Sequence, residues 1–196
     1  MVFLLICIVV LKKIDATRLK KIILSPLNSN YIEHETEETS SFFDAFKSVL
    51  FIFLTVIISF LIYKLTTYYV TESNEGFFSF FKIFSVVFSF FILKRNLEQL
   101  LTFTFKIEKE LHFFVTTKFS YLNAIAFLIL ISLIIVEFSA ISSSFLFYFS
   151  AILFLFRFVL IVSINKNLIF SKLFYFILYI CAFEIAPLFI LFKLMF

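Results

Sequence analysis

Glycine, tryptophan, histidine and cysteine are scarce in this chain of 196 residues. It has one glycine and no tryptophan, with two histidines and two cysteines. The single glycine, Gly76, excludes the glycine-rich loops that hold nucleotide phosphates. It also disfavours the broken helices and close helix crossings that transporters often build with glycine. Enzymes built on phosphate loops are therefore excluded, and a transporter lacks one of its usual marks.

The cysteines and histidines form no recognisable catalytic or metal motif. Cys7 and Cys181 lie far apart inside apolar stretches, which indicates two inert buried thiols. His34 lies among four glutamates, but their spacing matches no defined metal site, and we prefer a solvated acidic loop. No HExxH motif, GxSxG motif or Cys–His pairing is present. The sequence therefore predicts no metal site, no cofactor and no catalytic residue, and it leans towards a non-enzymatic protein.

Charged residues are also few, and hydrophobic ones dominate. The chain is 15% charged and 63% hydrophobic, with 35 phenylalanines. A soluble domain has about 25% charged residues and about half apolar ones. A soluble protein of this composition would keep a large apolar exterior, whereas lipid would cover that surface. The fold class that this predicts is all-α, a single integral membrane helical bundle over residues 1–196.

Six apolar segments are candidates for membrane helices. A span needs roughly 20 residues to cross about 30 Å of hydrocarbon. The first segment reaches only half that length and lacks the basic start and cleavage site of a signal peptide, so we expect a first helix that is short or truncated. The expected spans are approximately 2–11, 47–64, 77–93, 119–138, 145–164 and 173–192.

Basic residues alternate between the connections of these spans. Thirteen of the 17 lysines and arginines lie in the connections 12–46, 94–118 and 165–172 or at their edges. Because positive charge marks cytoplasmic loops, these three connections should be cytoplasmic. Six crossings would then leave both termini on the side of the membrane opposite the cytoplasm.

Two connections are expected to be partly helical. Asp15–Leu24 mixes apolar and basic residues and predicts a short helix on the membrane surface. Asn96–Phe114 predicts an amphipathic cytoplasmic helix. Five basic residues at the first connection should contact anionic lipid headgroups. They are Lys12, Lys13, Arg18, Lys20 and Lys21.

Charged side chains at membrane depth are the main functional candidates, because inserting each costs on the order of 3 kcal/mol. Glu184 lies near the middle of the last segment, and Arg157 lies in the segment before it. Those helices should be antiparallel neighbours, so we predict an Arg157–Glu184 pair. The alternative is that Arg157 extends to the cytoplasmic headgroups and that Glu184 is protonated.

Other polar and small residues in the spans suggest helix contacts. Pro187, three residues after Glu184, should kink the last helix. Ala182 and Ala186 form a small-xxx-small pair suited to close packing. A polar stripe in the third segment should face the bundle or a partner, although its lysine is expected to extend outward. The stripe consists of Ser79, Lys82, Ser85 and Ser89.

The C-terminal run resembles the closing helix of an uncharacterised membrane-protein family of Bacteroidota, a domain of unknown function. The resemblance rests on a Leu-Tyr-x-Cys-x-x-Glu-Ile-x-Pro pattern, and the order of spans is similar. The pattern is matched by Leu178, Tyr179, Cys181, Glu184, Ile185 and Pro187. The first helix departs from the family, whose members usually have a fuller one. The resemblance implies an inner-membrane location and no specific activity.

Three functions remain open from the sequence. The leading hypothesis is a non-enzymatic subunit or scaffold that packs against partner helices or a second copy, with no nucleic acid involved. The rival is a small transporter or proton-linked channel component that uses Glu184 and Arg157. An enzyme acting on lipids has least support, because no nucleophile–base pair is visible.

Overall fold

The computed structural model is a bundle of helices and describes residues 2–26, 45–69, 76–104, 108–139 and 142–164. Within these ranges there is no strand, so the all-α prediction is confirmed. The helices are α1 (Val2–Ile14), α2 (Ala16–Leu24), α4 (Ala45–Tyr69), α5 (Phe77–Thr104), α6 (Glu108–Phe138) and α7 (Ser143–Ile164).

Four of these helices are long and apolar enough to cross a membrane. Their candidate spans are Ala45–Tyr68, Phe77–Leu97, Phe114–Phe138 and Ser144–Ser163. The sequence places four spans at nearly the same positions. The first apolar segment forms α1, a helix of 13 residues that is shorter than a span. The last expected span, 173–192, lies outside the described residues.

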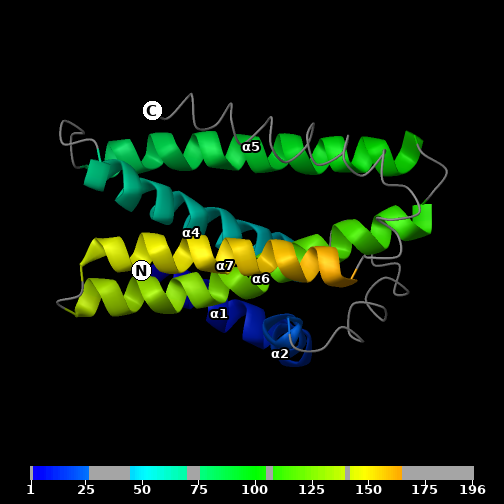
Figure 1. Ribbon diagram of the computed structural model, residues 1–196, viewed down its shortest axis with the longest axis horizontal. Coiled ribbons are helices and arrows are strands. Elements are labelled where there is room, and N and C mark those ends of the chain that lie inside the picture. The colour runs from blue at the N-terminus through cyan, green and yellow to red at the C-terminus, as the bar shows by residue number, and fades with distance from the viewer. Residues whose placement is uncertain (1, 27–44, 70–75, 105–107, 140–141, 165–196) are drawn as a thin grey trace.

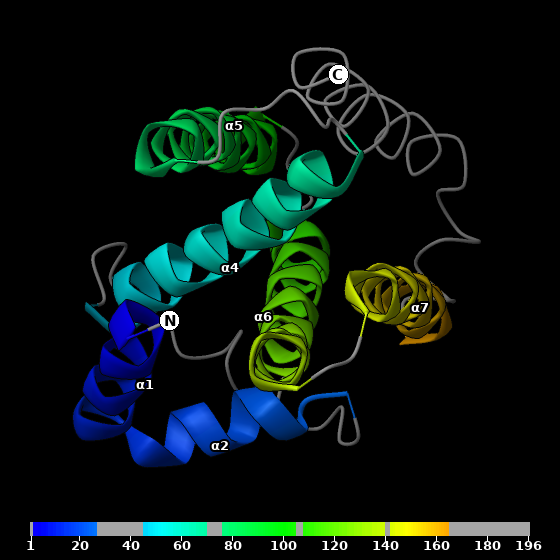
Figure 2. The ribbon, with the colours of Figure 1, turned by 90° about the vertical axis from the view of Figure 1, so that its left-hand side faces the viewer.

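Helices α4 and α6 form the centre of the bundle. Helix α4 contacts α1, α5, α6 and α7, and α6 contacts α2, α4, α5 and α7. Figure 1 shows the long helices running roughly along one axis. Figure 2 shows α5, α6 and α7 nearly end-on, with α2 running across the view. Helix α2 therefore lies crosswise to the long helices, as a helix on a membrane surface would.

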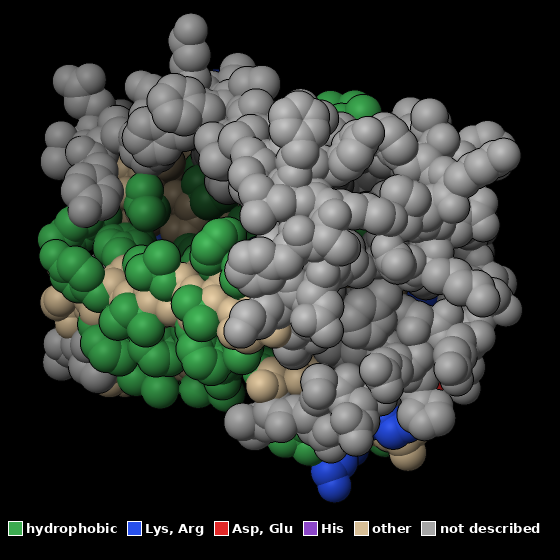
Figure 3. Space-filling model, turned by 45° about the vertical axis from the view of Figure 1, so that its right-hand side comes forward, with side chains coloured by type: hydrophobic (Ala, Val, Ile, Leu, Met, Phe, Trp, Pro, Cys, Tyr) green, Lys and Arg blue, Asp and Glu red, His purple; other side chains and the backbone are tan. Residues whose placement is uncertain are grey.

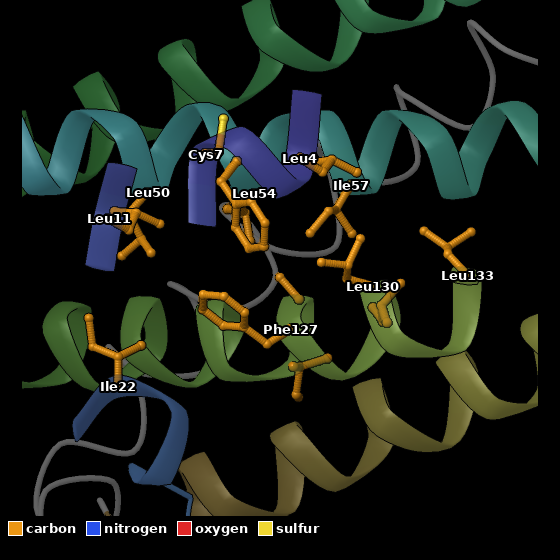
Figure 4. Packing of buried hydrophobic residues seen from close by; sticks show 14 of the residues in the cluster. Leu4, Cys7, Leu11, Ile22, Leu50, Leu54, Ile57, Phe127, Leu130 and Leu133 are labelled. Carbon is orange, nitrogen blue, oxygen red and sulfur yellow. The ribbon is translucent and has the colours of Figure 1, made fainter. Parts of the chain in front are cut away.

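The core lies where α1 and α6 meet α4. Figure 4 shows Leu11 beside Leu50 and Leu4 beside Ile57, so α1 runs antiparallel to α4 for about two turns. Both α1 residues are essentially inaccessible to solvent. On the other side of α4, the rings of Phe53 and Phe127 pack with centroids 4.7 Å apart. Packing of this kind, rather than exclusion of water, holds helices together in lipid.

Helix α5 joins the bundle through aromatic side chains at helical spacing. Phe80 lies 5.9 Å from Phe60 and from Tyr63, both of α4. Further along, Phe88 and Phe91 meet Phe51 edge to face at 6.1 and 6.3 Å. Phe84 stacks with both Phe80 and Phe88, so the aromatic residues recur at intervals of three to four and define one face of α5. The opposite face of α5 is left exposed.

The corner between α1 and α2 is fixed by Asp15. Its carboxylate accepts hydrogen bonds from the backbone amides of Thr17 and Arg18, each at 3.0 Å, and from the Thr17 hydroxyl at 2.7 Å. Asp15 itself has extended backbone angles, which is the geometry of an N-cap. The predicted surface helix over 15–24 therefore begins at Ala16, immediately after its cap.

Replacing Asp15 by Ala should destabilise the protein by about 0.5–2 kcal/mol, because the first turn of α2 loses its acceptor. The hydrogen bonds from the Arg18 amide and the Thr17 hydroxyl lower the pKa of the Asp15 carboxyl. Since the folded pKa is lowered, this stabilisation is present above the unfolded pKa and is lost as the pH falls below about 4. The free energies of unfolding of wild type and Asp15→Ala, compared in a neutral detergent at pH 7 and at pH 3, measure this stabilisation. A difference that is unchanged at pH 3 would contradict the cap's role.

The helix expected over 96–114 is divided between two longer helices in the described residues. Residues 96–104 continue α5, and residues 108–114 open α6. At about 1.5 Å per residue, α6 is roughly 46 Å long, whereas the hydrocarbon is about 30 Å thick. Both helices are therefore longer than their spans. The amphipathic segment is the part of each that continues beyond the span.

Candidate anion site at the basic end of the bundle

A pocket of about 190 Å³ lies where α2, α4, α5, α6 and α7 meet. Five basic residues from four different helices line it, and no carboxylate is among its described lining residues. The basic residues are Lys47, Lys94, Arg95, Lys118 and Arg157. Four of them come from the start of one span, the end of the next and the start of the third, and Arg157 comes from α7. Antiparallel packing of α4, α5 and α6 brings these ends together.

The rest of the pocket wall is largely apolar. Crosswise α2 supplies one residue, and the long helices supply the others. The apolar lining consists of Ile22, Phe46, Leu50, Phe51, Phe91, Val115, Phe119 and Leu122. The site thus combines a cluster of positive charges with aliphatic and aromatic walls, a pairing that suits an amphiphile with an anionic end.

Lys118 and Arg157 join the two helices on the inner side of the pocket. Lys118 is buried in α6, with 4% of its surface exposed. An Nη2 hydrogen of Arg157, from α7, is donated to the Lys118 backbone carbonyl at 3.1 Å. The bond holds the Arg157 guanidinium against α6. The positive charge that α7 contributes is therefore restricted in its movement. A planar guanidinium held in this way is suited to binding phosphate oxygens.

Aromatic rings orient two more arginines near the site. The Arg95 guanidinium lies over the ring of Phe51, 5.6 Å from its centroid. Arg18 of α2 lies over Phe46 at 5.9 Å. Cation–π contacts of this length are favourable and restrict the arginine side chains. Phe46 and Phe51 also line the pocket, so the same rings shape its wall and position positive charge at its edge.

Three uncharged polar side chains of α6 complete the lining: Thr116, Ser120 and Asn123. Asn123 is fully buried, and its Nδ2 donates to the Phe119 carbonyl at 3.0 Å. A carbonyl can only accept, so this bond identifies the nitrogen and leaves Oδ1 as the other amide atom. Oδ1 is buried and has no hydrogen-bond partner in the described part of the chain. A buried acceptor without a donor is costly, and it marks a place where a ligand hydroxyl or amine would be stabilised.

The opposite end of the bundle has different chemistry. The Nζ of Lys64 lies 2.8 Å from the Glu137 carboxylate, which ties α4 to α6. Nearby, the hydroxyls of Tyr68 and Ser144 lie 3.0 Å apart. Both contacts join the ends that the sequence places outside the cytoplasm. The basic pocket and this paired, neutral end therefore occupy opposite ends of the long helices.

The exterior between the two ends is apolar. Figure 3 shows hydrophobic side chains gathered over the described part of one face, with Lys and Arg side chains at its lower edge. Large hydrophobic residues such as Leu155, Phe156 and Val159 of α7 are at least half exposed. Such a surface would be unstable in water and is the surface that lipid tails cover. The protein is therefore built as a membrane protein.

Among the predicted intramembrane residues that the structure describes, Arg157 alone lines the pocket. Lys82, Ser85 and Ser89 are exposed on α5, so this part of the polar stripe faces away from the bundle. The stripe was predicted to face the bundle or a partner, and of these two alternatives the contact with a partner stays a prediction. The other predicted residues lie outside the described part of the chain, and the Arg157–Glu184 pair stays a prediction. They are Ala182, Glu184, Ala186 and Pro187.

The basic residues predicted to meet headgroups lie on α1 and α2. Arg18 is half-buried over Phe46, as described above, and the other four are exposed. The exposed ones are Lys12, Lys13, Lys20 and Lys21. Their place on the crosswise helix and at the end of α1 is compatible with headgroup contact, which stays a prediction. Ile22 links this surface to the pocket wall.

The polar run at the start of the third long span was missed in the sequence. Within residues 116–123, six of eight side chains are polar, although this stretch opens an otherwise apolar span. Thr117, Lys118, Ser120 and Asn123 are all buried. Buried polar groups in a membrane helix usually serve packing or function. The density of such residues in this one stretch was the available signal.

Comparison with known proteins places the chain in one family. No curated protein and no solved structure matches it significantly. One family model, described as a domain of unknown function (DUF4271), matches residues 1–195. The match covers nearly the whole chain, including α1 and the helices that form the pocket. The chain belongs to the DUF4271 family.

Proposed function

We propose that the protein is a non-enzymatic, multi-pass component of a bacterial inner membrane, in Bacteroidota, that binds a phosphate-bearing anion at its cytoplasmic end. The observation that carries the proposal is the convergence of five basic side chains from four helices on one pocket. A single basic residue near a span end is ordinary, because it can extend to the headgroups. Five around one cavity, including buried Lys118, form a site with a definite preference for negative charge.

The cytoplasmic placement rests on the sequence. The basic pocket residues from α4, α5 and α6 lie in, or at the edges of, the connections that positive-inside bias assigns to the cytoplasm. Both termini would then be periplasmic. Anionic lipids give the cytoplasmic leaflet a negative surface, so a positive pocket at this level would face abundant anions.

Thermal unfolding of delipidated protein in a neutral detergent tests the proposal. Phosphate-bearing anions, supplied as pyrophosphate or as phosphatidylglycerol, should raise the unfolding midpoint because they bind only the folded pocket. Sodium chloride at matched ionic strength is the control and should give no such rise. Excess sodium chloride added together with the anion should reverse the gain. No rise with either anion would refute anion binding.

The scaffold role is a proposal for the apolar exterior and the exposed stripe of α5. Lys82, Ser85 and Ser89 offer polar contacts in the membrane that lipid tails do not use. A partner helix or a second copy of the chain would satisfy them. Purification in mild detergent followed by mass measurement tests this role. A strictly monomeric particle without a partner would count against it.

The transporter alternative stays open through Arg157. The structure places this residue in the pocket, where it could tune an ionisable group that moves protons. In that case Glu184→Gln should abolish a pH-dependent flux in proteoliposomes. An unchanged flux would remove the alternative.

A further inference from the structure

The shape of the pocket points to the source of its anion. We propose that it binds the headgroup of an anionic phospholipid, with the phosphodiester on the basic side chains and a headgroup hydroxyl on Asn123. The inference rests on the proposed anion-binding function and specifies its ligand. Three observations favour a lipid over a water-soluble phosphate: the pocket wall, the depth of Arg157 and the unpaired acceptor of Asn123.

The wall is the first observation. Half of the described lining residues are apolar, including Phe46, Phe91 and Leu122. Sites for free phosphate are built from backbone amides and polar side chains, which surround the anion. Aliphatic and aromatic walls add nothing to such an anion. They can pack against the glycerol ester region and the first methylenes of acyl chains, which a soluble phosphate does not have.

The depth of the site is the second observation. Arg157 lies six residues before the end of its candidate span at Ser163. At about 1.5 Å per residue, its Cα is roughly 9 Å inside that end. A soluble anion would have to leave water to reach a guanidinium at this level. A lipid phosphate already lies at the interface, and its chains extend along the helices towards the membrane centre.

The unpaired acceptor of Asn123 is the third observation. Asn123 is one of the lining residues, and its Oδ1 is buried and lacks a donor among the described residues. A phosphodiester has no hydrogen to donate, whereas the glycerol hydroxyls of phosphatidylglycerol do. The volume of about 190 Å³ suits a group smaller than a drug-sized ligand, such as one phosphoglycerol headgroup. The pocket is therefore expected to prefer a hydroxyl-bearing anionic headgroup.

Lipid retention measures this preference. The delipidated protein is exposed to an equimolar mixture of phosphatidylglycerol, phosphatidic acid and phosphatidylcholine, and bound lipid is counted by native mass spectrometry. Wild type should retain phosphatidylglycerol first. Arg157→Met and Lys94→Met should each reduce this retention about fivefold. Arg157→Met also removes the hydrogen bond from Arg157 to α6 and so loosens α7. Lys94→Met is therefore included as a second variant, which leaves that bond in place. Lys82→Met removes the same charge from the exposed side of α5, and this variant should retain phosphatidylglycerol as wild type does.

The headgroup hydroxyl has its own test. Asn123→Leu removes the acceptor and should lower the preference for phosphatidylglycerol over phosphatidic acid, whose phosphate carries no glycerol headgroup. Total anionic lipid retained should change less, because the basic residues remain. A preference that is unchanged in Asn123→Leu would overturn the role of Asn123.

Soluble glycerol phosphate separates the two levels of the proposal. If it stabilises the protein as well as phosphatidylglycerol does, and Arg157→Met removes both effects, the anion site stands and the lipid inference fails. If wild type, Arg157→Met and Lys94→Met retain lipid equally, the lipid covers the outside of the bundle and does not occupy the pocket. The lipid inference then fails. If neither compound binds, both proposals fail. Selective, Arg157-dependent retention of the lipid alone supports both.

Discussion

Replacing Lys118 by Met should weaken phosphatidylglycerol binding about 30-fold while the bundle stays folded. Lys118 is the most buried of the pocket's basic residues, with 4% of its surface exposed. Truncating one member of a buried, hydrogen-bonded charge pair costs at least about 2 kcal/mol in binding, which corresponds to roughly 30-fold. Met keeps the length and apolar stem of the side chain, so packing around the stem should survive. Titration of lipid into delipidated protein measures the affinity.

Lys118→Arg is the matched variant and should restore most of the affinity, since it restores the charge. The wild-type affinity should also fall with salt, and the Met variant should show a shallower dependence. Equal affinity of wild type and Lys118→Met, with both proteins folded, would show that the anion does not reach this lysine.

Phe53→Ala should cause the largest loss of stability, about 3 kcal/mol. Phe53 is fully buried in α4, and its ring packs 4.7 Å from that of Phe127 in α6. Truncating a buried Phe to Ala costs about 3–5 kcal/mol in soluble proteins. The lower end is expected here, because an unfolded helix stays in lipid and regains apolar surroundings, so mainly packing is lost.

Ile52→Ala is the control for this substitution. Ile52 precedes Phe53 on the same helix but is 39% exposed on the lipid-facing side. Its truncation should cost less than about 1 kcal/mol, because lipid fills the space that is left. Unfolding of both variants in mixed micelles with increasing denaturing detergent measures the difference. Similar costs for the two would mean that α4 does not pack against α6 as described.

The long helices were predictable from sequence because lipid imposes a simple rule. Each span must be about 20 apolar residues long, and the segments at 47–64, 77–93, 119–138 and 145–164 satisfy this within a few residues of the observed candidate spans. The short helix α2 was predictable from its mixed apolar and basic pattern, whereas its position on the membrane surface stays a prediction. Length, charge and periodicity are local properties, so they can be read directly.

The pocket was not predictable, because it depends on how helices rotate and pair. Nothing local indicates that Lys94 and Lys118 lie on the same cavity, or that Arg157 bonds to the α6 backbone. The side to which the α5 stripe turns was not predictable for the same reason, because its serines allowed a contact with either the bundle or a partner. In the structure the aromatic residues Phe80 and Phe91 meet α4 instead. In a helix that is apolar all round, sequence does not reveal which side packs.

The central claim is that the long helices cross a membrane with their basic ends together in the cytoplasm. Labelling of single cysteines with a membrane-impermeant maleimide, in intact spheroplasts, tests it most directly after Cys7 and Cys181 are changed to Ser. Gly76 has open space for a side chain, and Asn96 is exposed near the basic end of α5. Gly76→Cys should label in intact spheroplasts, whereas Asn96→Cys should label only after lysis. Equal labelling of both before lysis would place the two ends of α5 on one side of the membrane and contradict the account.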